Sequence, residues 1–560
     1  MKLLNRAGLL MASKRIRNSK AALLGVILLA AFFLRVVDIT GNPPALYGDE
    51  LTLSLDANSL LQTAHDQTGA FLPLYFKMSD GRPPAYVYFS VPFVALFGPD
   101  ELGVRALSIL SGVWIVALTF LLTRQMLGEE VAFFAAGLMA LSPWDIAMSR
   151  GGFESHFGLF LTMLGIWALL GSVKKPWLMI VSALGFGLAV HTYHSYKPLV
   201  FLILPALIWF IGTKNSFSGK FRKYLFSSTA IFVFLIGVWI WQIFAGSEIR
   251  LQDTNILGQK DLQTKIVQDI NIQRSASSLP IPVAVLFHNK FLSNALLIGE
   301  NYFDNFFPDF LFLHGDGNPR QNPATMGELY FVQLILIFFG GYYIFIRDRR
   351  LFILLIFLLA VAPLPAAVVA DAHALRSAFL LPTLTILSGA GLYFLWMIAK
   401  RNIRMKAVLW GLVSLLLLQF LFFTERTYFL APNLYGQFWS VPAKQASLLA
   451  EKSKNNFSYV VISNQIDNIQ YAYPVYAEVF PGDVQDQNKN PYLTNGMVFR
   501  KYGNVLIGSM GEQNLQQSLK NLPGSLLYIG APKDLQQLPS ADITYDKEGL
   551  PMFISFKKNN

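Results

Sequence analysis

Long runs of apolar residues recur along most of the chain, separated by short polar segments. Each run is close to the roughly 20 residues that an α-helix needs to cross the hydrocarbon core of a bilayer. The pattern predicts a polytopic α-helical membrane protein with about eleven spans. The predicted spans are 21–39, 102–122, 131–147, 157–172, 177–193, 198–212, 225–244, 328–346, 351–369, 378–398 and 407–423.

A further apolar segment, 84–97, is about 14 residues long, which is short for a span. It follows Arg82 and Pro83 and runs into "FGP". We expect a re-entrant or interfacial segment here. Counting it as a span would also move the later basic loops to the opposite side of the membrane.

Composition agrees with a membrane protein. The chain is 54% hydrophobic and 14% charged, and its mean hydropathy is +0.44, whereas soluble domains carry roughly a quarter charged residues. The first apolar run is too long for a signal peptide and lacks an A-x-A cleavage site, so we expect a retained span. The absence of cysteine excludes disulfides, thiol catalysis and cysteine-bound metals.

The net charge of +11 comes from basic residues beside apolar runs, which is a topology signal and does not call for a nucleic-acid partner. Six basic residues precede the first span, and others cluster in 174–175, 214–223, 347–350 and 400–406. The positive-inside rule predicts a cytoplasmic N-terminus and places these basic clusters on the cytoplasmic side of the cell membrane. The loops 40–101 and 246–327 are then outside.

The C-terminal part differs in kind from the rest. Residues 425–560 alternate short β-rich runs, such as "YVVIS", "NVLIG" and "LLYIG", with polar and helical stretches. We predict a transmembrane domain over 1–424 and an extracytoplasmic α/β domain over 425–560. This second domain is expected to bind a substrate or to stabilise the protein.

Ionisable residues that no topology rule requires gather at the outer ends of the predicted spans. Charge near the hydrocarbon boundary is costly, so such residues usually mark a site or pair with one another. The set comprises Asp49, Glu50, Asp80, Arg82, Arg150, Glu154, His156, His191, His194, Lys197, Asp371, His373 and Arg376.

These side chains fit a particular kind of substrate. A carboxylate can deprotonate a hydroxyl group or hold a divalent cation, and Arg and Lys bind phosphate oxygens. A polyprenyl-phosphate sugar, with a lipid tail and a phosphate at the interface, would meet all of these groups. The residues leave open whether a divalent cation takes part.

Each motif also has a plainer structural interpretation. Asp49 and Glu50 can cap a helix that begins near Leu51. Arg150 and Glu154 can form an i,i+4 ion pair. The spacing of His191 and His194 is compatible with zinc, but the sequence offers only His373 or a distant acid to complete a site.

Several stretches resemble a known superfamily. They are "GDE" after the first span, "GRPPAYVYFSVPFVALFG", "VRALSILSGVWIVALTFLLTRQMLG", "SPWDIAMSRGGFESHFGLFLTMLG", "HTYHSYKPL" and "DAHALRSAFLLP". In this order they resemble the protein O-mannosyltransferases and aminoarabinose transferases, membrane glycosyltransferases with the GT-C fold. The resemblance covers roughly residues 20–400, and the C-terminal part lies outside it.

The resemblance implies an inverting transfer of a sugar from polyprenyl phosphate to an acceptor hydroxyl on the outer side of the membrane. Asp49 would be the catalytic base and Glu50 would support it. The donor and acceptor, a protein, lipid or glycan, would be held by Asp80, Arg82, Arg150, Glu154, His194, Lys197 and Arg376.

The sequence departs from the superfamily pattern at two places. "LTLSL" follows the acid pair, where a basic and an aromatic residue are common. Gly81 precedes Arg82, where some relatives have an acid, and Asp80 lies one place earlier.

Other functions remain open on the sequence. A ligase for lipid-linked oligosaccharides or wall polymers would use the same lipid chemistry with a larger donor. A secondary transporter would show inverted repeats and ionisable groups at the bilayer midplane, whereas no such repeat stands out here and the charges gather at one face. A scaffold or sensor would function without Asp49.

Overall fold

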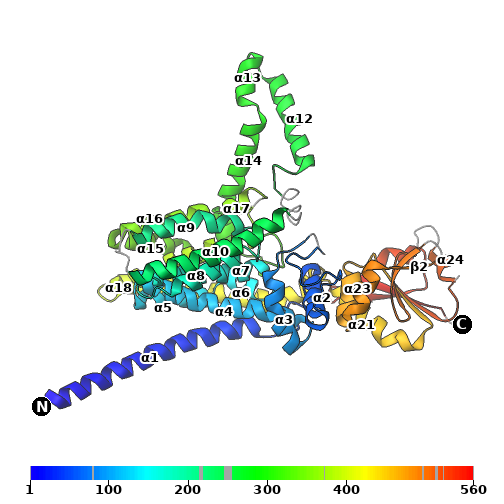
Figure 1. Ribbon diagram of the computed structural model, residues 1–560, viewed down its shortest axis with the longest axis horizontal. Coiled ribbons are helices and arrows are strands. Elements are labelled where there is room, and N and C mark those ends of the chain that lie inside the picture. Colours follow the sequence, from blue (N-terminus) through cyan, green and yellow to red (C-terminus); the bar gives the residue numbers. More distant parts are fainter. Residues whose placement is uncertain are drawn as a thin grey trace.

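The computed structural model describes residues 2–77, 81–212, 219–244, 255–370, 372–494, 497–510, 515–520 and 522–558. Its larger part is a bundle of apolar helices, and a smaller sheet domain lies beyond one end of that bundle (Figure 1). The predicted polytopic helical protein with a C-terminal α/β part is confirmed.

Every apolar run predicted as a span contains helix, and the shorter apolar segment 84–97 forms the helix α3. The helices are α1 (Lys2–Val36), α3 (Ala85–Phe97), α4 (Glu101–Met126), α5 (Glu129–Ala140), α6 (Pro143–Ser149), α7 (Glu154–Gly171), α8 (Leu178–Ala189), α9 (Tyr196–Gly212), α10 (Gly219–Phe244), α15 (Phe331–Arg347), α16 (Arg349–Val361), α17 (Leu364–Ala367), α18 (Leu380–Ala399) and α19 (Ile403–Glu425). Among the described residues, 8 helices are long and apolar enough to cross a membrane, or 9 with the bent pair α5–α6.

Polar caps set the ends of several helices. Asp100 accepts hydrogen bonds from the first amides of α4, and Asp348 and Asn402 do the same for α16 and α19. Ser142 caps α6 and Pro143 follows it, so the chain turns by 56° between α5 and α6. This bend directs the segment after α6 toward the site.

Helices α15 and α18 pack closely through glycine. A Cβ atom built on Gly340 would lie 1.8 Å from the carbonyl oxygen of Leu387, and one on Gly391 would lie 2.0 Å from that of Leu336. Small residues let membrane helices approach until their backbones touch. Larger side chains at these positions would therefore separate the pair.

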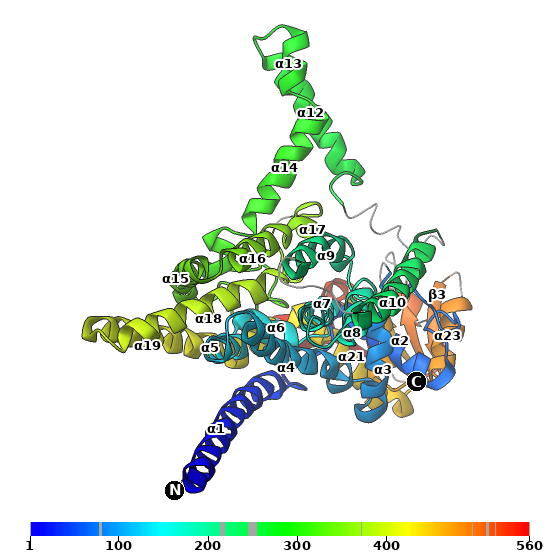
Figure 2. The ribbon, with the colours of Figure 1, turned by 60° about the vertical axis from the view of Figure 1, so that its left-hand side comes forward.

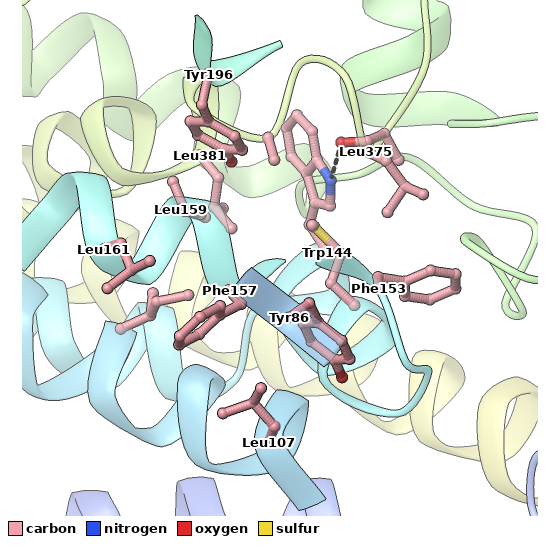
Figure 3. Packing of buried hydrophobic residues seen from close by; sticks show 14 of the residues in the cluster. Tyr86, Leu107, Trp144, Phe153, Phe157, Leu159, Leu161, Tyr196, Leu375 and Leu381 are labelled. Atoms are coloured by element: carbon pink, nitrogen blue, oxygen red, sulfur yellow. Dashed lines mark hydrogen bonds between the residues drawn. The ribbon is translucent and has the colours of Figure 1, made fainter. Parts of the chain in front are cut away.

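Large aromatic side chains fill the centre of the bundle (Figure 3). Tyr86, Trp144, Phe153 and Phe157 are buried together, and the indole of Trp144 donates a hydrogen bond of 3.1 Å to the carbonyl of Ala374. These contacts fix the turn before α18 against α6. That turn carries part of the site.

The sheet domain contains seven strands in the order β2-β3-β4-β1-β5-β7-β6. Strands β4, β1 and β5 are parallel, and the outer strands are antiparallel. Its elements are α20 (Ala431–Leu434), α21 (Val441–Ser453), β1 (Tyr459–Ser463), α22 (Ile469–Tyr476), α23 (Pro481–Lys489), β2 (Tyr492–Thr494), β3 (Met497–Tyr502), β4 (Val505–Gly508), α24 (Leu515–Lys520), β5 (Leu526–Gly530), β6 (Asp542–Tyr545) and β7 (Pro551–Lys558).

The two predicted loops contain helices of their own. Helix α2 (Gly48–Thr63) lies between the bundle and the sheet domain (Figure 1). In the second loop, α12 (Lys260–Ala276), α13 (Ile281–Phe287) and α14 (Lys290–Asp304) form an arm that projects from the bundle in both views (Figures 1 and 2). The sequence analysis did not predict this arm.

Candidate active site

A cavity of about 420 Å³ lies beside the first turn of α2. Its walls come from α2, the segment before α3, the start of α7, the α8–α9 turn, α10 and the segments around α17. The lining residues are Tyr47, Asp49, Gly81, Arg82, Pro83, Glu154, Thr192, Tyr193, His194, Ser195, Lys197, Pro198, Phe201, Trp239, Asn255, Arg320, Gln321, Pro365, Val368, Val369, His373, Leu375 and Arg376.

Asp49 stands in the first turn of α2, where the helix dipole favours a carboxylate. Its side chain is 49% exposed and lines the cavity. The preceding Tyr47 is buried, and burial, with the charge of Asp49, raises the pKa of its hydroxyl well above the usual value. The carboxylate of Asp49 therefore has open space beside it and a neutral phenol nearby.

Arg82 joins the acids of two segments. One Nη2 hydrogen bond of 2.9 Å goes to the carbonyl oxygen of Asp49, and another of 2.8 Å goes to the hydroxyl of Thr52. The guanidinium lies 3.9 Å from Asp49 Oδ1, and its Nε lies 3.7 Å from Glu154 Oε1. Residues 49, 82 and 154, far apart in the chain, thus meet at one cavity.

The guanidinium of Arg82 has further hydrogen-bonding capacity. The side chain is buried, and its Nε and Nη1 atoms have no hydrogen-bond partner among the described residues. Burial alone would lower the pKa of Arg82, but Glu154 and Asp49 outweigh it and the pKa is raised. Arg82 is therefore a permanent cation with donors left for an anion.

Further basic side chains line the same cavity. Lys197 is buried, and its Nζ lies 3.3 Å from His194 Nδ1 and 5.9 Å from the ring centre of Trp239. Arg376 is also a lining residue, and Arg320 lies 4.8 Å from the ring centre of Tyr47. Burial lowers the pKa of His373 to about 4 despite the nearby Asp316, so His373 is neutral at pH 7.

One wall of the cavity is apolar. It includes Phe201 of α9, Trp239 of α10 and Val368, which follows α17. Phe201 and Val368 are 41% and 40% exposed, so this wall continues onto the apolar outer surface of the bundle. The cavity therefore joins a charged interior to the face that lipids would cover.

Glu50 does not line this cavity, although the sequence paired it with Asp49. It is fully buried and receives 2.9 Å hydrogen bonds from both Nε and Nη2 of Arg105, and one of 2.7 Å from the amide of Gly152. Arg105 also binds the carbonyls of Ile39, Pro43 and Ala45. The pair fixes the loop before α2, and a positioning role fits Glu50 better than contact with a substrate.

Arg150 also lies outside the cavity wall. Its guanidinium is buried, donates to the carbonyls of Val37 and Asn42, and stacks at 4.6 Å on Tyr428. No ion pair joins it to Glu154 among the interactions of the described residues; Glu154 is paired with Arg82 instead. Arg150 therefore anchors the segment that follows α1.

The remaining residues that the sequence singled out do not line the cavity with Asp49 and Arg82, or lie outside the described residues. His156 lies 2.9 Å from Asp145, which also binds Arg35, in a buried cluster inside the bundle. His191 lies 3.0 Å from the carbonyl of Leu235. In the part of the chain that the structure describes, no group of three His, Asp or Glu could hold a metal ion. Asp80 and Asp371 lie outside the described residues.

Sequence reasoning missed several members of this region. Tyr47, Arg320 and Gln321 line the cavity, and Arg105 holds Glu50. Tyr47 stands two places before Asp49, which was a usable signal. Arg105 lies inside a predicted span, where a charge is unusual and was itself a signal of a buried partner.

Part of the chain is similar in sequence to known proteins. Residues 81–241 match a family model described as dolichyl-phosphate-mannose-protein mannosyltransferase. That segment includes Arg82, Glu154 and Lys197 but begins after Asp49. YycA from Bacillus subtilis strain 168, provisionally named a mannosyltransferase, is 31% identical over 212 residues, which cover 37% of this chain and 30% of YycA.

A second curated relative is the undecaprenyl phosphate-alpha-4-amino-4-deoxy-L-arabinose arabinosyl transferase of Pseudomonas savastanoi pv. phaseolicola strain 1448A. It is 25% identical over 194 residues, covering 33% of this chain and 36% of that protein. The chain spans about a third of the length of these curated relatives.

The crystal structure of apo ArnT from Cupriavidus metallidurans matches almost the whole chain. Its TM-score is 0.53 at 13% identity, over 97% of this chain and 98% of ArnT. The structure of the same protein bound to undecaprenyl phosphate gives 0.52 over 96% of this chain and 97% of ArnT. The expected fold is confirmed: this chain is a multi-pass membrane protein with the GT-C fold that ArnT has.

Proposed function

We propose that this protein is a glycosyltransferase that moves a sugar from a polyprenyl-phosphate donor to the hydroxyl group of an acceptor. The observation that carries the proposal is the meeting of Asp49, Arg82 and Glu154 at a cavity that is also lined by the apolar side chains of Phe201, Trp239 and Val368. A half-exposed carboxylate, a cluster of cations and a lipid-facing wall suit the three parts of such a donor. The structure of ArnT bound to undecaprenyl phosphate and the match of residues 81–241 to the dolichyl-phosphate-mannose-protein mannosyltransferase family support the same substrate class.

In the proposed reaction the acceptor oxygen attacks the anomeric carbon, and the bond from that carbon to the phosphate oxygen breaks. The bonding electrons leave with the polyprenyl phosphate, and Asp49 takes the proton of the acceptor hydroxyl. Attack from the face opposite the phosphate inverts the anomeric configuration. Fixed groups of opposite charge stabilise the separating charges of this transition state.

The cations of the cavity have the matching role. The free N–H groups of Arg82, together with Lys197 and Arg376, hold the phosphate as its negative charge grows. Glu154 and Asp49 keep Arg82 charged and in place. The apolar residues Phe201, Trp239 and Val368 receive the first part of the lipid tail.

We also propose that the site faces the outside of the cell membrane. Basic residues lie at the turns 174–175, 347–350 and 400–401, at the bundle end away from the sheet domain (Figure 1). By the positive-inside rule that end is cytoplasmic. The cavity and the sheet domain are then on the outer side.

The test compares wild type with Asp49→Asn in a transfer assay. Purified protein in vesicles receives a radiolabelled polyprenyl-phosphate hexose, and membrane extract of the source organism supplies the acceptor. We expect Asp49→Asn to lower the rate at which label leaves the lipid fraction by roughly 100-fold or more, the usual effect of losing a general base.

Asp542→Asn is the matched control, because Asp542 is an exposed acid on β6 of the sheet domain and does not line the cavity. It should transfer sugar at the wild-type rate. Gel filtration and thermal unfolding must show equal folding of the two variants. Equal transfer by Asp49→Asn and wild type would remove Asp49 from the mechanism.

A further inference from the structure

In the arm formed by α12, α13 and α14, polar side chains lie in the interior and apolar side chains lie on the surface. Where α12 and α14 meet, the amide of Gln263 donates a 2.8 Å hydrogen bond to Asn294. The buried residues of α14 are Asn294 and Asn301, and those of α12 are Gln263 and Ile270. Polar side chains therefore form much of the interior of the arm, the opposite of a helical hairpin that is folded in water.

Apolar side chains cover the outside of α13 and α14. Phe291 is 84% exposed, and Leu296 and Phe303 are exposed on the same helix. A contiguous apolar surface of this kind marks contact with a partner or a membrane. The exposed apolar residues of these two helices are Ile281, Val283, Val285, Leu286, Phe287, Phe291, Leu296 and Phe303.

The limb α12 has a different character. Four charged residues, Lys260, Asp261, Lys265 and Asp269, are exposed along it, together with the apolar Val267 and Ile272. One limb of the arm therefore suits water and the other suits hydrocarbon. A helix pair that lies on a membrane surface has one side exposed to water and one side in contact with lipid.

By length and composition, 281–313 could also cross a bilayer. The structure argues against a continuous span, because α13 ends at Phe287 and Asn289 caps a separate helix α14. In Figures 1 and 2, α14 also runs across the direction of the long bundle helices such as α4 and α18. A helix perpendicular to the spanning helices lies in the plane of the bilayer.

The base of the arm is attached to the cavity wall. Asn301 donates a 3.1 Å hydrogen bond to the carbonyl of Ala367, and the amide of Ile256 donates one of 2.9 Å to the carbonyl of Val368. Val368 lines the cavity, as does the neighbouring Asn255. The arm thus connects the membrane surface beside the bundle to the entrance of the site.

We propose that the arm 260–304 is a membrane-surface anchor whose partner is the lipid bilayer. Helices α13 and α14 lie in the interface with their apolar side chains among the upper acyl chains, and α12 lies on the water side. Lys290 and Glu300 are exposed on α14 and extend toward the headgroups. This inference concerns lipid contact and does not depend on the proposed reaction.

Single spin labels can test it, since the chain contains no cysteine. Phe291→Cys and Phe303→Cys are labelled in phosphatidylethanolamine–phosphatidylglycerol vesicles, and their depth is measured from the relative accessibility to oxygen and to a water-soluble nickel chelate. Twelve residues of α-helix rise about 18 Å. We expect both labels at the same depth, about 5–10 Å below the headgroups.

Three control positions calibrate the measurement. Phe234→Cys on α10 reports the lipid-facing side of a spanning helix, whereas Asp269→Cys on α12 and Phe480→Cys in the sheet domain should be open to the nickel chelate. A difference near 18 Å between residues 291 and 303 would make α14 a span. Nickel access equal to that of residue 480 would place it in water. Either result overturns the proposal.

Discussion

At the residue scale, the neighbours Asp49 and Glu50 show how one helical step separates two roles. Successive residues of an α-helix point about 100° apart. Asp49 is directed at the cavity, and Glu50 is turned into the protein against Arg105. An acid pair in a sequence can therefore place one carboxylate at a cavity and use the other to hold a loop in position.

Asp56 shows a second effect at this scale. It is buried on α2, and burial raises the pKa of its carboxyl to about 7, although Arg82 and Gln67 pull it down. Because the folded-state pKa lies above the unfolded value, the folded protein binds this proton more tightly. The free energy of unfolding should fall as the pH rises from about 4 to about 7 and then level off.

We predict that Asp56→Asn removes this decline. The melting temperature of the variant relative to wild type should increase between pH 5 and pH 7 and stay constant above that range. Thermal unfolding of both proteins in the same detergent, from pH 5 to pH 9, measures the difference, with Asp542→Asn as control. A difference that does not change with pH would contradict the prediction.

At the scale of elements, α2 is held between the bundle and the sheet domain. Gln485 of α23 donates hydrogen bonds of 2.8 Å and 3.0 Å to Ser59 and Thr63 of α2. Lys444 of α21 binds Glu101 at 2.7 Å, and the hydroxyl of Tyr476 in α22 donates to the same carboxylate. The sheet domain therefore positions the helix that carries Asp49.

The ion pair of Lys444 with Glu101 offers a prediction for this junction. Glu101 is nearly buried, so Lys444→Ala leaves a charge without its partner. We expect the variant to lose about 2 to 3 kcal/mol of stability, below the range for fully buried pairs because Lys444 is partly exposed. The proposed sugar transfer should fall mainly in kcat, because the substitution leaves untouched the cavity cations that we propose bind the donor.

Lys454→Ala is the matched control. Lys454 pairs with Glu451 just beyond α21, and both side chains are about a third exposed, so its loss should change stability by less than about 1 kcal/mol. Denaturation and kinetic measurements on the two variants give the comparison. Equal effects of the two substitutions would show that the junction does not hold α2.

Whole-molecule orientation follows from where the charges lie. We predict that, in intact cells, a membrane-impermeant maleimide labels Asp542→Cys in the sheet domain but not Lys175→Cys or Arg349→Cys. The last two should react after the membrane is permeabilised, because basic turns remain in the cytoplasm. Labelling of position 175 in intact cells would invert the topology and place the cavity inside.

The long helices of the bundle could be predicted from the sequence. Apolar runs such as 102–122 and 378–398 correspond to α4 and α18, because a chain in hydrocarbon must satisfy its backbone hydrogen bonds locally and so forms helix. Helix lengths were predicted less accurately for the shorter apolar runs. The stretch 177–193 corresponds to the 12-residue helix α8, and a turn ends it before a full span.

The arm escaped prediction for a related reason. Its polar residues Gln263, Asn294 and Asn301 resemble those of an ordinary loop until a partner helix and α17 stand opposite them. The π-helical turn Asp309–Leu313 after the arm has no clear sequence signal either. Contacts between elements gave these segments their structure.

The sequence by itself determined the class of the molecule. The apolar runs, the basic turns and the β-rich tail each act over a few neighbouring residues, so local pattern is enough to predict helices and the sheet domain. Asp49, Arg82 and Glu154 could also be picked out one by one, since ionisable side chains beside hydrocarbon need a reason to be there.

Tertiary structure decided which of those side chains act together. Arg82 met Asp49 and Glu154, Glu50 went to Arg105, and Arg150 went to the carbonyls at the end of α1. Each pairing joins segments far apart in the chain, and it depends on how helices cross and where α5–α6 bends. Such contacts arise only when the whole bundle has packed, because no local pattern of residues encodes the distance between two helices.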